Sequence, residues 1–229
     1  MKQCLLCGQD FIPAISLLQV FSWRQQNKQC ICPNCLNKFR LLAEPTCPIC
    51  SAELSSTKIC TDCLTWQKSY GNQLLRNYAL YRYNQSFHDL MVNYKRYGDF
   101  VLRLALAQLC ALPLAKIKAD FYVPLPTSPE HLQKRQFDTV MGIYQDVVPL
   151  TSLLVTTGGF GAQGEKNRQE RLARPQSFSV VDQAKVDLNH HKVLLLDDIY
   201  TTGRTLYHAR DAILAVFPQA KIESFTICR

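Results

Sequence analysis

The sequence has no long hydrophobic run and no low-complexity tract. Its most apolar window, residues 101–115, is interrupted by Arg103 and Pro113 and is too short to cross a bilayer. The first ~15 residues also lack the basic start, the apolar core and the small-residue cleavage site of a signal peptide. The composition, with 47% apolar and 19% charged residues, is typical of a globular protein. We therefore expect a cytoplasmic protein without membrane insertion.

Acidic residues are few relative to basic ones: 18 Asp and Glu stand against 26 Lys and Arg, for a net charge of +8. Such a surplus favours a polyanionic partner. Residues 1–70 hold seven basic and four acidic residues. If the cysteines of this segment bind zinc as thiolates, the segment becomes nearly neutral. The positive surplus then belongs to residues 71–229, where we expect any nucleic acid to bind.

Cysteine, in contrast, is abundant, with eleven residues, nine of them before residue 64. Eight of these nine form four CxxC pairs, and two such pairs supply the four thiolates of a tetrahedral Zn²⁺ site. A disulfide framework conflicts with the expected location, because cytosolic thiols stay reduced. Four CxxC pairs in series also disfavour a redox motif. The predicted ligands of two structural zinc sites are Cys4, Cys7, Cys32, Cys35, Cys47, Cys50, Cys60 and Cys63.

The spacing of the CxxC pairs favours one way of combining them. The short gap between Cys50 and Cys60 joins the third and fourth pairs, and the first two pairs, 24 residues apart, then form the other site. An interleaved arrangement stays open, and Cys30 could substitute as a ligand. Cys110 and Cys228 lie in apolar surroundings and are predicted to be small core residues. A segment this short and poor in large apolar residues needs the metal to fold.

The run Tyr70-Gly71-Asn72 marks the expected boundary between a zinc-binding domain, residues 1–70, and a larger domain, residues 71–229. Strands alternate with helices in the larger domain, which predicts an α/β fold with a mainly parallel sheet. Helices are expected to begin after the capping residues Ser86 and Asp99. The other predicted elements are strands over 77–83, 121–126, 152–156, 193–196 and 222–228, helices over 137–147 and 205–217, and a polar helix or lid-like loop over 168–174.

Three segments of this domain bear on phosphate binding. Gly159-Phe-Gly-Ala-Gln-Gly164 matches GxGxxG, but the residues after it are charged on every face. A dinucleotide-binding helix must pack on its sheet and needs an apolar stripe there, so this reading is disfavoured. The same segment fails as a P-loop, because Glu165 occupies the position of the required lysine.

The third segment, Val193 to Thr205, is the strongest candidate. Four apolar residues form a buried strand, and Asp197 and Asp198 then place two carboxylates at the carboxyl edge of the sheet, where open α/β folds bind ligands. Acceptor-only groups suit the two hydroxyls of a ribose. The following Thr201-Thr-Gly-Arg-Thr205 opens a helix, whose unpaired N–H groups and dipole favour a phosphate. The segment therefore predicts a sugar-phosphate site.

These residues resemble the 5-phosphoribosyl-1-pyrophosphate (PRPP) loop of type I phosphoribosyltransferases. The CxxC pairs before the domain and the order of the motifs make the chain similar to the ComF/GntX family over essentially its whole length. This resemblance implies a type I phosphoribosyltransferase-like parallel sheet with helices on both faces, preceded by a small zinc-ribbon domain. The further segments that carry it are Lys95-Arg-Tyr-Gly-Asp99, Val123-Pro-Leu-Pro126, Arg135-Gln-Phe-Asp138 and the spaced Gln163, Arg168, Arg171 and Phe178.

The resemblance also implies the roles of individual residues. In the superfamily the paired acids bind the ribose hydroxyls, the loop cradles the 5′-phosphate, and Mg²⁺ bridges ribose and pyrophosphate oxygens. It assigns catalytic roles to Asp197, Asp198 and Lys95, and Lys95, Arg168 and Arg171 would stabilise the charge of the leaving pyrophosphate. The PRPP-binding residues that it implies are Asp197, Asp198, Thr201, Thr202, Gly203, Arg204, Thr205, Pro124, Leu125, Arg168 and Arg171.

The sequence departs from the superfamily at three positions. Thr201 stands where purine-salvage members often carry an aspartate, and Gln136 and Asp138 replace the glycine and asparagine of an R-G-F-N motif. Binding of a sugar phosphate is therefore better supported than catalysis. Whether the protein is an enzyme stays open at this point.

A basic and aromatic stretch is the candidate for nucleic acid. Arg76, Arg82, Lys95 and Arg96 interleave with tyrosines 78, 81, 83, 94 and 97, which suits backbone neutralisation with base stacking. The same pattern also fits a tyrosine-rich core. The family resemblance implies a competence-associated protein of DNA uptake that binds PRPP and single-stranded DNA. The alternatives are a phosphoribosyltransferase of unknown acceptor, or a non-catalytic PRPP-responsive module that docks the uptake helicase.

Overall fold

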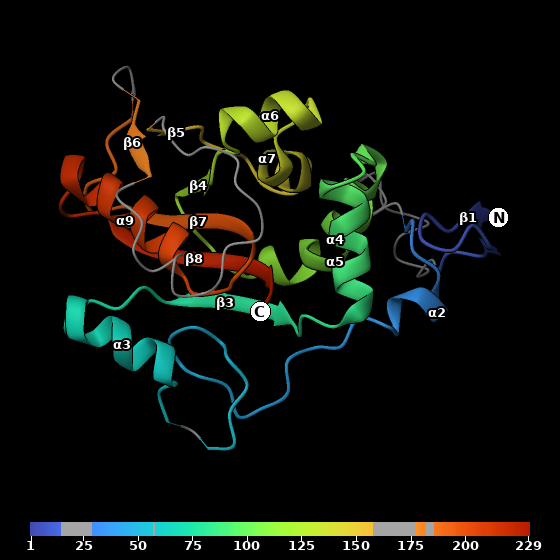
Figure 1. Cartoon of the computed structure of the whole chain (residues 1–229), viewed down its shortest axis with the longest axis horizontal. Coiled ribbons are helices and arrows are strands. Elements are labelled where there is room, and N and C mark those ends of the chain that lie inside the picture. The colour runs from blue at the N-terminus through green and yellow to red at the C-terminus, as the bar shows by residue number, and fades with distance from the viewer. Residues whose placement is uncertain (15–28, 57, 158–176, 182–185) are drawn as a thin grey trace.

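The computed structural model describes residues 1–14, 29–56, 58–157, 177–181 and 186–229 (Figure 1). Its centre is a four-stranded parallel sheet in the order β3-β8-β7-β4, formed by Asn77–Tyr81, Lys221–Cys228, Lys192–Ile199 and Phe121–Pro124. Because all four strands run the same way, their carboxyl ends meet at one edge of the sheet.

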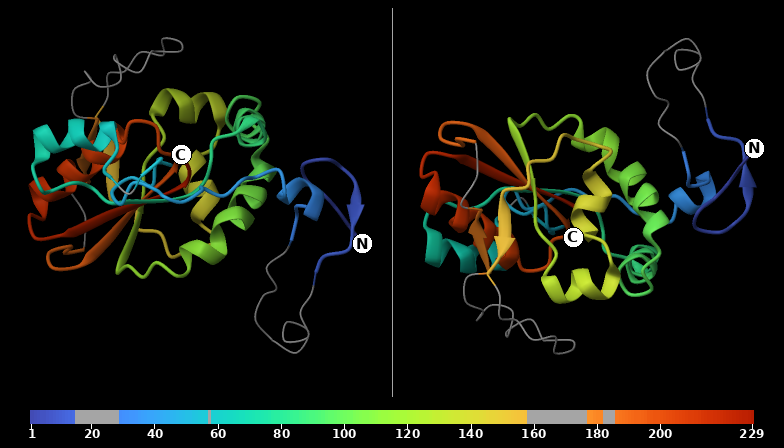
Figure 2. Two further views of the ribbon diagram at one scale, coloured as in Figure 1. Left: turned by 90° about the horizontal axis from the view of Figure 1, so that it is seen from below. Right: turned by 90° about the horizontal axis from the view of Figure 1, so that it is seen from above.

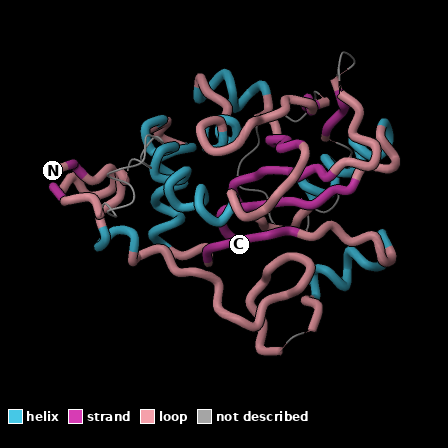
Figure 3. Tube along the Cα trace, turned by 180° about the vertical axis from the view of Figure 1, so that it is seen from behind, coloured by secondary structure: helices cyan, strands magenta, loops and turns pink. Residues whose placement is uncertain are grey.

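Helices cover both faces of this sheet, as Figure 3 shows from behind. Leu194 and Leu196 of β7 pack with the helices α4, α5 and α7, whereas Val193 and Leu195 pack on the opposite face with α9. Successive strand residues point to opposite faces, so a strand buried on both sides is apolar at every position. The helix bounds are Gln85–Lys95 for α4, Arg103–Leu114 for α5, Thr139–Tyr144 for α7 and Arg204–Val216 for α9. The predicted α/β class and parallel sheet are confirmed.

Several element boundaries differ from the predicted ones. Asn84, not Ser86, caps α4, since its side chain accepts a hydrogen bond from the Phe87 amide at 3.0 Å. The predicted helix after Asp99 begins as a 3₁₀ turn, η1 (Phe100–Leu102), and α5 continues through Pro113 to Leu114. Strand β7 extends to Ile199, so both acids belong to the strand itself.

Three short elements lie outside the predicted set or are shorter than predicted. Helix α6, Pro129–Arg135, was not predicted, nor was strand β6, Phe178–Val180, which pairs antiparallel with β5, Leu154–Thr156. Helix α7 is shorter than the predicted 137–147, because Asp138 caps it by accepting from the Met141 amide at 2.8 Å. The polar stretch 168–174 and both glycine motifs of 159–165 lie outside the described residues.

The cysteine-rich segment packs against the larger domain at two separate places (Figure 2). Its first part contains β1 (Lys2–Gln3), β2 (Asp10–Phe11) and α2 (Pro33–Leu36) and lies beside α5. There the side chain of Gln108 accepts hydrogen bonds from the amides of Cys30 and Ile31 at 2.7 and 3.1 Å. Its second part ends in α3 (Thr61–Tyr70), which lies beside β3 and α9. Within the described residues, no helix is both long and apolar enough to cross a membrane.

Candidate functional site

The two acids of β7 lie side by side at the carboxyl edge of the sheet. Asp198 is buried, with 4% of its surface exposed, and Asp197 is partly buried. The backbone around them is fixed, because the Tyr144 hydroxyl donates to the Asp197 carbonyl at 2.8 Å and the Asp198 amide donates to Asp197 Oδ1 at 2.9 Å. The strand therefore presents two carboxylates with little freedom to move.

Lys95, the last residue of α4, brings a positive charge to these acids. Its ammonium group forms an ion pair with Asp198 Oδ2. This oxygen is buried, and the Lys95 ammonium is its positively charged partner. Arg135 stands next to Lys95, and its Nε donates to the Lys95 carbonyl at 2.8 Å. The structure thus brings together the three residues that the family resemblance assigns to catalysis, with a second cation beside them.

The environment of the acid pair alters their protonation. Burial, together with the charge of Asp198, raises the pKa of Asp197 to about 7. Burial also lowers the pKa of Arg135. A buried carboxylate pair of this kind is stabilised by hydroxyl donors or a cation. The carboxylates of Asp197 and Asp198 consequently suit the hydroxyls of a sugar or a Mg²⁺ ion.

The loop after β7 leads into α9 and has the shape of an anion site. Gly203 has φ of 79°, in the left-handed region, and a Cβ atom there would lie 2.2 Å from the Tyr200 hydroxyl. Thr202 is buried, whereas Thr201 and Thr205 are exposed. Arg204 begins the thirteen-residue helix α9, so the positive end of the helix dipole lies at this loop, and the Arg204 amide donates to Thr202 Oγ1 at 3.4 Å.

The end of β4 closes another side of the site. Pro124 pairs in register with Leu196, and the Leu125 amide donates to the Leu196 carbonyl at 3.0 Å. Beyond it, both carboxylate oxygens of Asp138 accept backbone amides, from Thr127 and Met141, at 2.8 Å. Both oxygens of the Asp138 carboxylate are therefore occupied by local backbone hydrogen bonds. Arg168 and Arg171, the remaining predicted PRPP ligands, lie outside the described residues.

Gln136 explains one departure from the R-G-F-N motif. It ends helix α6 with φ of 64°, the left-handed conformation that glycine adopts without strain. The structure therefore keeps the backbone geometry of a glycine position while carrying a side chain there.

The eight predicted cysteines gather into two tetrads, Cys4, Cys7, Cys32 and Cys35, and Cys47, Cys50, Cys60 and Cys63. Within each, the sulfur atoms all lie within 4.8 Å of one another. The expected combination of CxxC pairs is confirmed, and the interleaved arrangement does not occur. Cys30 belongs to neither tetrad, because its Sγ donates to Gln108 Oε1. Cys110 and Cys228 are fully buried core residues, as predicted.

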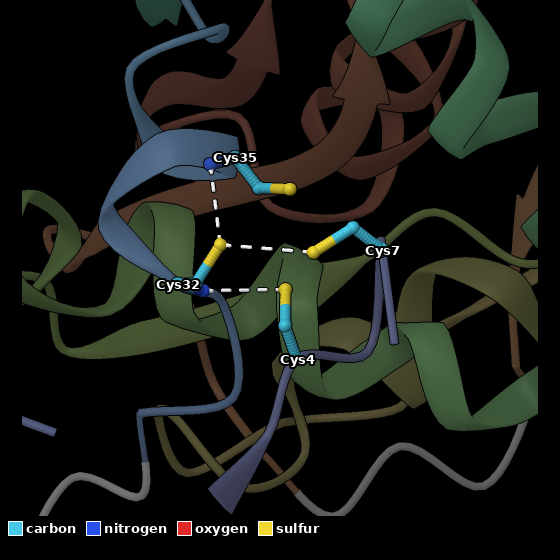
Figure 4. A group of neighbouring side chains, drawn as sticks. All are labelled: Cys4, Cys7, Cys32 and Cys35. Atoms are coloured by element: carbon cyan, nitrogen blue, oxygen red, sulfur yellow. Dashed lines mark hydrogen bonds between the residues drawn. The ribbon is translucent and has the colours of Figure 1, made fainter. Parts of the chain in front are cut away.

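The geometry of both tetrads fits a tetrahedral metal ion. Figure 4 shows the first tetrad, in which the Sγ atoms of Cys7 and Cys32 are 3.8 Å apart. In the second, the Sγ atoms of Cys50 and Cys60 are 3.4 Å apart. Tetrahedral zinc with Zn–S near 2.3 Å requires about 3.8 Å between sulfurs. In each tetrad one cysteine amide donates to a sulfur of the same CxxC pair, Cys35 to Cys32 and Cys63 to Cys60, at 3.4 Å. Both tetrads could hold zinc.

The residues predicted to contact nucleic acid do not form one cluster. Arg76 precedes β3 and stacks over Tyr78, while Arg82 follows the same strand and pairs with Glu53 at 2.6 Å. Lys95 and Arg96 lie at the end of α4. Of the five tyrosines in the predicted pattern, Tyr94 belongs to the core, and Tyr83 and Tyr97 are the exposed ones, at 43% and 75%.

Two residues at this site were not identified from the sequence. Trp66 of α3 donates from its indole Nε1 to the Thr202 carbonyl at 2.7 Å, so it contacts the loop between β7 and α9 directly. No local pattern around Trp66 indicates this contact, because Thr202 lies 136 positions away in the chain. Arg135, noted as part of a motif, was likewise not assigned to the site.

Comparison with known proteins gives two relatives that extend over almost the full length of the chain. No family model matches the sequence. Competence protein ComFC of Streptococcus pneumoniae (strain ATCC BAA-255 / R6) is 31% identical over 227 residues, covering 99% of this chain and 100% of the relative. Competence protein ComFC of Bacillus subtilis (strain 168) is 26% identical over 231 residues, covering 99% and 94%. With an α/β fold, two cysteine tetrads and this degree of identity, the chain belongs to the ComFC family of competence proteins.

Proposed function

We propose that this competence-associated protein binds PRPP, or a related ribose 5-phosphate ligand, at the carboxyl edge of its sheet. The observation that carries the proposal is the position of Asp197 and Asp198 immediately before a glycine-containing loop that opens α9. The carboxylates accept hydrogen bonds from the ribose hydroxyls, and the loop residues 201–205 donate to the 5′-phosphate.

The same residues suit Mg²⁺ as a companion of the ligand. Carboxylates and phosphate oxygens are the ligands that this ion prefers, and Asp197 and Asp198 place two carboxylates next to each other in β7. Bound there, Mg²⁺ would neutralise pyrophosphate charge. Lys95, which already contacts Asp198, supplies a positive charge for the same purpose.

Calorimetric titration with PRPP and Mg²⁺ tests this proposal. We expect saturable binding by the wild type and at least a tenfold weaker affinity for Asp198→Asn, because the neutral amide is a poorer acceptor for ribose hydroxyls. Asp120→Asn is the matched control, since Asp120 precedes β4 at the opposite edge of the same sheet and accepts from the Lys192 amide. Equal affinity of wild type and Asp198→Asn, or no binding by the wild type, would contradict the proposal.

Catalysis is the second candidate function. The three residues that would act on PRPP are in contact at the site, but Thr201 stands where an acid often serves near the nucleobase. An active protein would transfer the labelled ribosyl group of PRPP to an acceptor and release pyrophosphate, and Asp198→Asn would lose this transfer. Tight PRPP binding without transfer to any acceptor would favour a PRPP-responsive module that docks a partner such as the uptake helicase.

We also propose that the protein binds single-stranded DNA in the cytoplasm. The net charge of +8 and the exposed Tyr83 and Tyr97 support this, with Arg82 and Arg96 as neighbours in the chain. Fluorescence anisotropy with a labelled oligonucleotide should give an affinity that falls steeply with salt. Tyr97→Ala should weaken binding several-fold, whereas Tyr94→Phe, a change in the core, should leave it unchanged.

Zinc is the proposed occupant of both tetrads, and residues 1–70 are the proposed zinc-binding segment before a phosphoribosyltransferase-like domain of residues 71–229. Thiolate tetrads of this size select zinc among the common cellular cations. Elemental analysis of the purified protein should find two zinc ions per chain, as the two tetrads require. Each double substitution of one CxxC pair should remove one of them.

A further inference from the structure

Helix α3 connects the second cysteine tetrad with the phosphate loop. The helix begins at the tetrad, because Cys60 is its capping residue and accepts a hydrogen bond from the Cys63 amide at 3.4 Å. Both sulfurs are members of the tetrad, and both residues are buried. The direction and position of the first helical turn therefore depend on the geometry of the tetrad.

Trp66, one turn after Cys63, reaches the loop from this helix. Its indole Nε1 donates to the Thr202 carbonyl at 2.7 Å, and both residues are buried, with 8% and 6% exposed. The ring is held in place by stacking on Tyr207 of α9, with centroids 4.4 Å apart. This hydrogen bond fixes the backbone at the residue before Gly203, in the middle of the loop that would receive the phosphate.

A second, independent contact ties the same helix to the start of the loop. Asp62, which lies between the two tetrad cysteines of α3, pairs with the Arg229 guanidinium at 3.4 Å. That guanidinium lies over the ring of Tyr200, 4.5 Å from its centroid. Tyr200 in turn occupies the space beside Gly203 that a larger residue would need. Residues 200–203 are thus held from two directions by side chains that lie on or pair with α3.

Among the residues that the structure describes, the first tetrad has no such connection. The segment that carries it packs against α5 through Gln108. Three of its cysteines, Cys4, Cys32 and Cys35, belong to the apolar cluster on the face of the sheet opposite to α9. The second tetrad belongs to the cluster that includes Trp66, Tyr200 and Tyr207. The second tetrad therefore shares an apolar cluster with the side chains that hold residues 200–203, and the first tetrad belongs to a different cluster.

We propose that Trp66 is a positioning residue that couples the second cysteine tetrad to the phosphate loop, so that an intact second tetrad holds the loop ready for its ligand. The inference rests on the proposed binding of a sugar phosphate at that loop and adds that this affinity is set by the second tetrad and not by the first. Preorganisation of the loop lowers the entropy that ligand binding must otherwise overcome.

The first test separates loop positioning from general stability. Trp66→Phe keeps an aromatic ring against Tyr207 and removes the indole donor together with one ring of the side chain. Tyr70→Phe is the matched control, because it removes a hydrogen bond of the same α3–α9 contact, from the Tyr70 hydroxyl to Asp211 at 2.6 Å, without touching the loop. We expect PRPP affinity to fall about tenfold in Trp66→Phe and to stay within twofold in Tyr70→Phe. Similar affinities in the two variants would overturn the proposal.

The second test measures the loop without any ligand. Amide hydrogen exchange of residues 200–205 should become at least tenfold faster in Trp66→Phe and in Cys63→Ser, which disrupts the second tetrad. It should stay unchanged in Cys35→Ser, which disrupts the first. Acceleration of equal size in both cysteine variants, or unchanged exchange in Trp66→Phe, would overturn the coupling.

These two readouts also distinguish the coupling from the proposed function. If the wild type binds no PRPP but the loop amides respond to Trp66→Phe and Cys63→Ser as expected, the coupling stands and the ligand assignment fails. If the wild type binds PRPP but neither readout responds to Trp66→Phe, the ligand assignment stands and the coupling fails. Each result therefore decides one of the two statements.

Discussion

The Lys95 ammonium at the end of α4 forms an ion pair with the buried Asp198 carboxylate of β7. The two residues are far apart in the sequence and come together at the carboxyl edge of the sheet, where the loop between β7 and α9 also begins. Asp197 adds a second carboxylate next to this ion pair. Burial raises the pKa of Asp197 to about 7. A site with two acids and one direct cation partner has a strong preference for further positive or hydrogen-bond-donating groups, which a ribose and Mg²⁺ supply.

The ion pair leads to a prediction about stability. Lys95→Met should lower the free energy of unfolding at pH 8 by roughly 2–3 kcal/mol, because Asp198 is left buried without its cation. Lys95→Arg keeps the charge and should recover most of the loss. Chemical denaturation of the three proteins measures this. A change below about 0.5 kcal/mol in Lys95→Met would mean that the pair contributes no net stability.

The raised pKa of Asp197 predicts that its contribution to the free energy of unfolding falls as the pH rises. A salt-bridged acid with a lowered pKa would show the opposite pH dependence. In the unfolded chain the pKa of this carboxyl is near its usual value of 3.8, and in the folded protein the pKa is about 7. Between these values the folded state binds the extra proton, so the contribution of Asp197 to stability falls as the pH rises through that interval. Asp197→Asn should therefore stabilise the ligand-free protein at pH 8 by about 1–2 kcal/mol and change it little at pH 4. Thermal unfolding at both pH values, with Asp120→Asn as control, checks the sign.

The same titration should appear in ligand binding. Asp197 accepts hydrogen bonds best when ionised, so PRPP affinity should rise between pH 6 and pH 8 as the carboxyl loses its proton near its pKa of about 7. Asp197→Asn should bind more weakly, and the part of the pH dependence that it removes reports the aspartate. The phosphate groups of the ligand titrate nearby, and ribose 5-phosphate measured in parallel accounts for that contribution. Identical pH profiles for the variant and the wild type would argue against a role for Asp197 in binding.

Gly203 and Gly98 form a matched pair for testing the loop. Both have left-handed φ, 79° and 75°, but a Cβ atom at Gly203 would lie 2.2 Å from the Tyr200 hydroxyl, whereas at Gly98 nothing lies within 4 Å. Gly98→Ala should cost about 1 kcal/mol for the backbone alone. Gly203→Ala should cost roughly 2 kcal/mol or more and abolish ligand binding. Equal losses of stability in Gly98→Ala and Gly203→Ala would show that the Tyr200 ring moves away from the new methyl group without a measurable energetic penalty.

Gln136 offers a stabilising substitution. Gln136→Gly should raise the free energy of unfolding by about 0.5–1 kcal/mol, because glycine adopts φ of 64° without strain. Gln145→Gly is the control. Gln145 caps the C-terminus of α7 in the right-handed conformation, with φ of −56°, so glycine at this position should lower the free energy of unfolding. Denaturant unfolding of both variants shows whether each substitution raises or lowers the free energy of unfolding.

Much of the fold followed from local patterns in the sequence. The continuous apolar run before Asp197 predicted a strand covered on both faces, and Leu194 and Leu195 do pack on opposite sides of the sheet. The order of strands and helices predicted a parallel sheet, and the CxxC spacing predicted both the number of tetrads and their members. These features depend on residues close together in the chain or on a simple period.

Short elements and capping residues were predicted less well. Both Asn84 and Ser86 are suitable caps for α4, and only the folded backbone selects the one whose side chain meets the Phe87 amide. Helix α6 has no apolar face to produce a periodic pattern, since it contains no buried residue. The interleaved tyrosines could have been a stacking surface or a core, and packing buried Tyr94 while leaving Tyr97 exposed.

The sequence by itself determined that this chain has two cysteine tetrads and an acid pair followed by a helix-opening loop, because each of these is written within a few neighbouring residues. Only the tertiary structure decided which side chains surround the loop between β7 and α9 and the acid pair before it. Trp66 and Thr202 are separated by 136 positions, and Lys95 reaches Asp198 from another helix. Such contacts follow from how helices pack across a sheet, and that packing depends on the combined burial of many side chains, which no local pattern records.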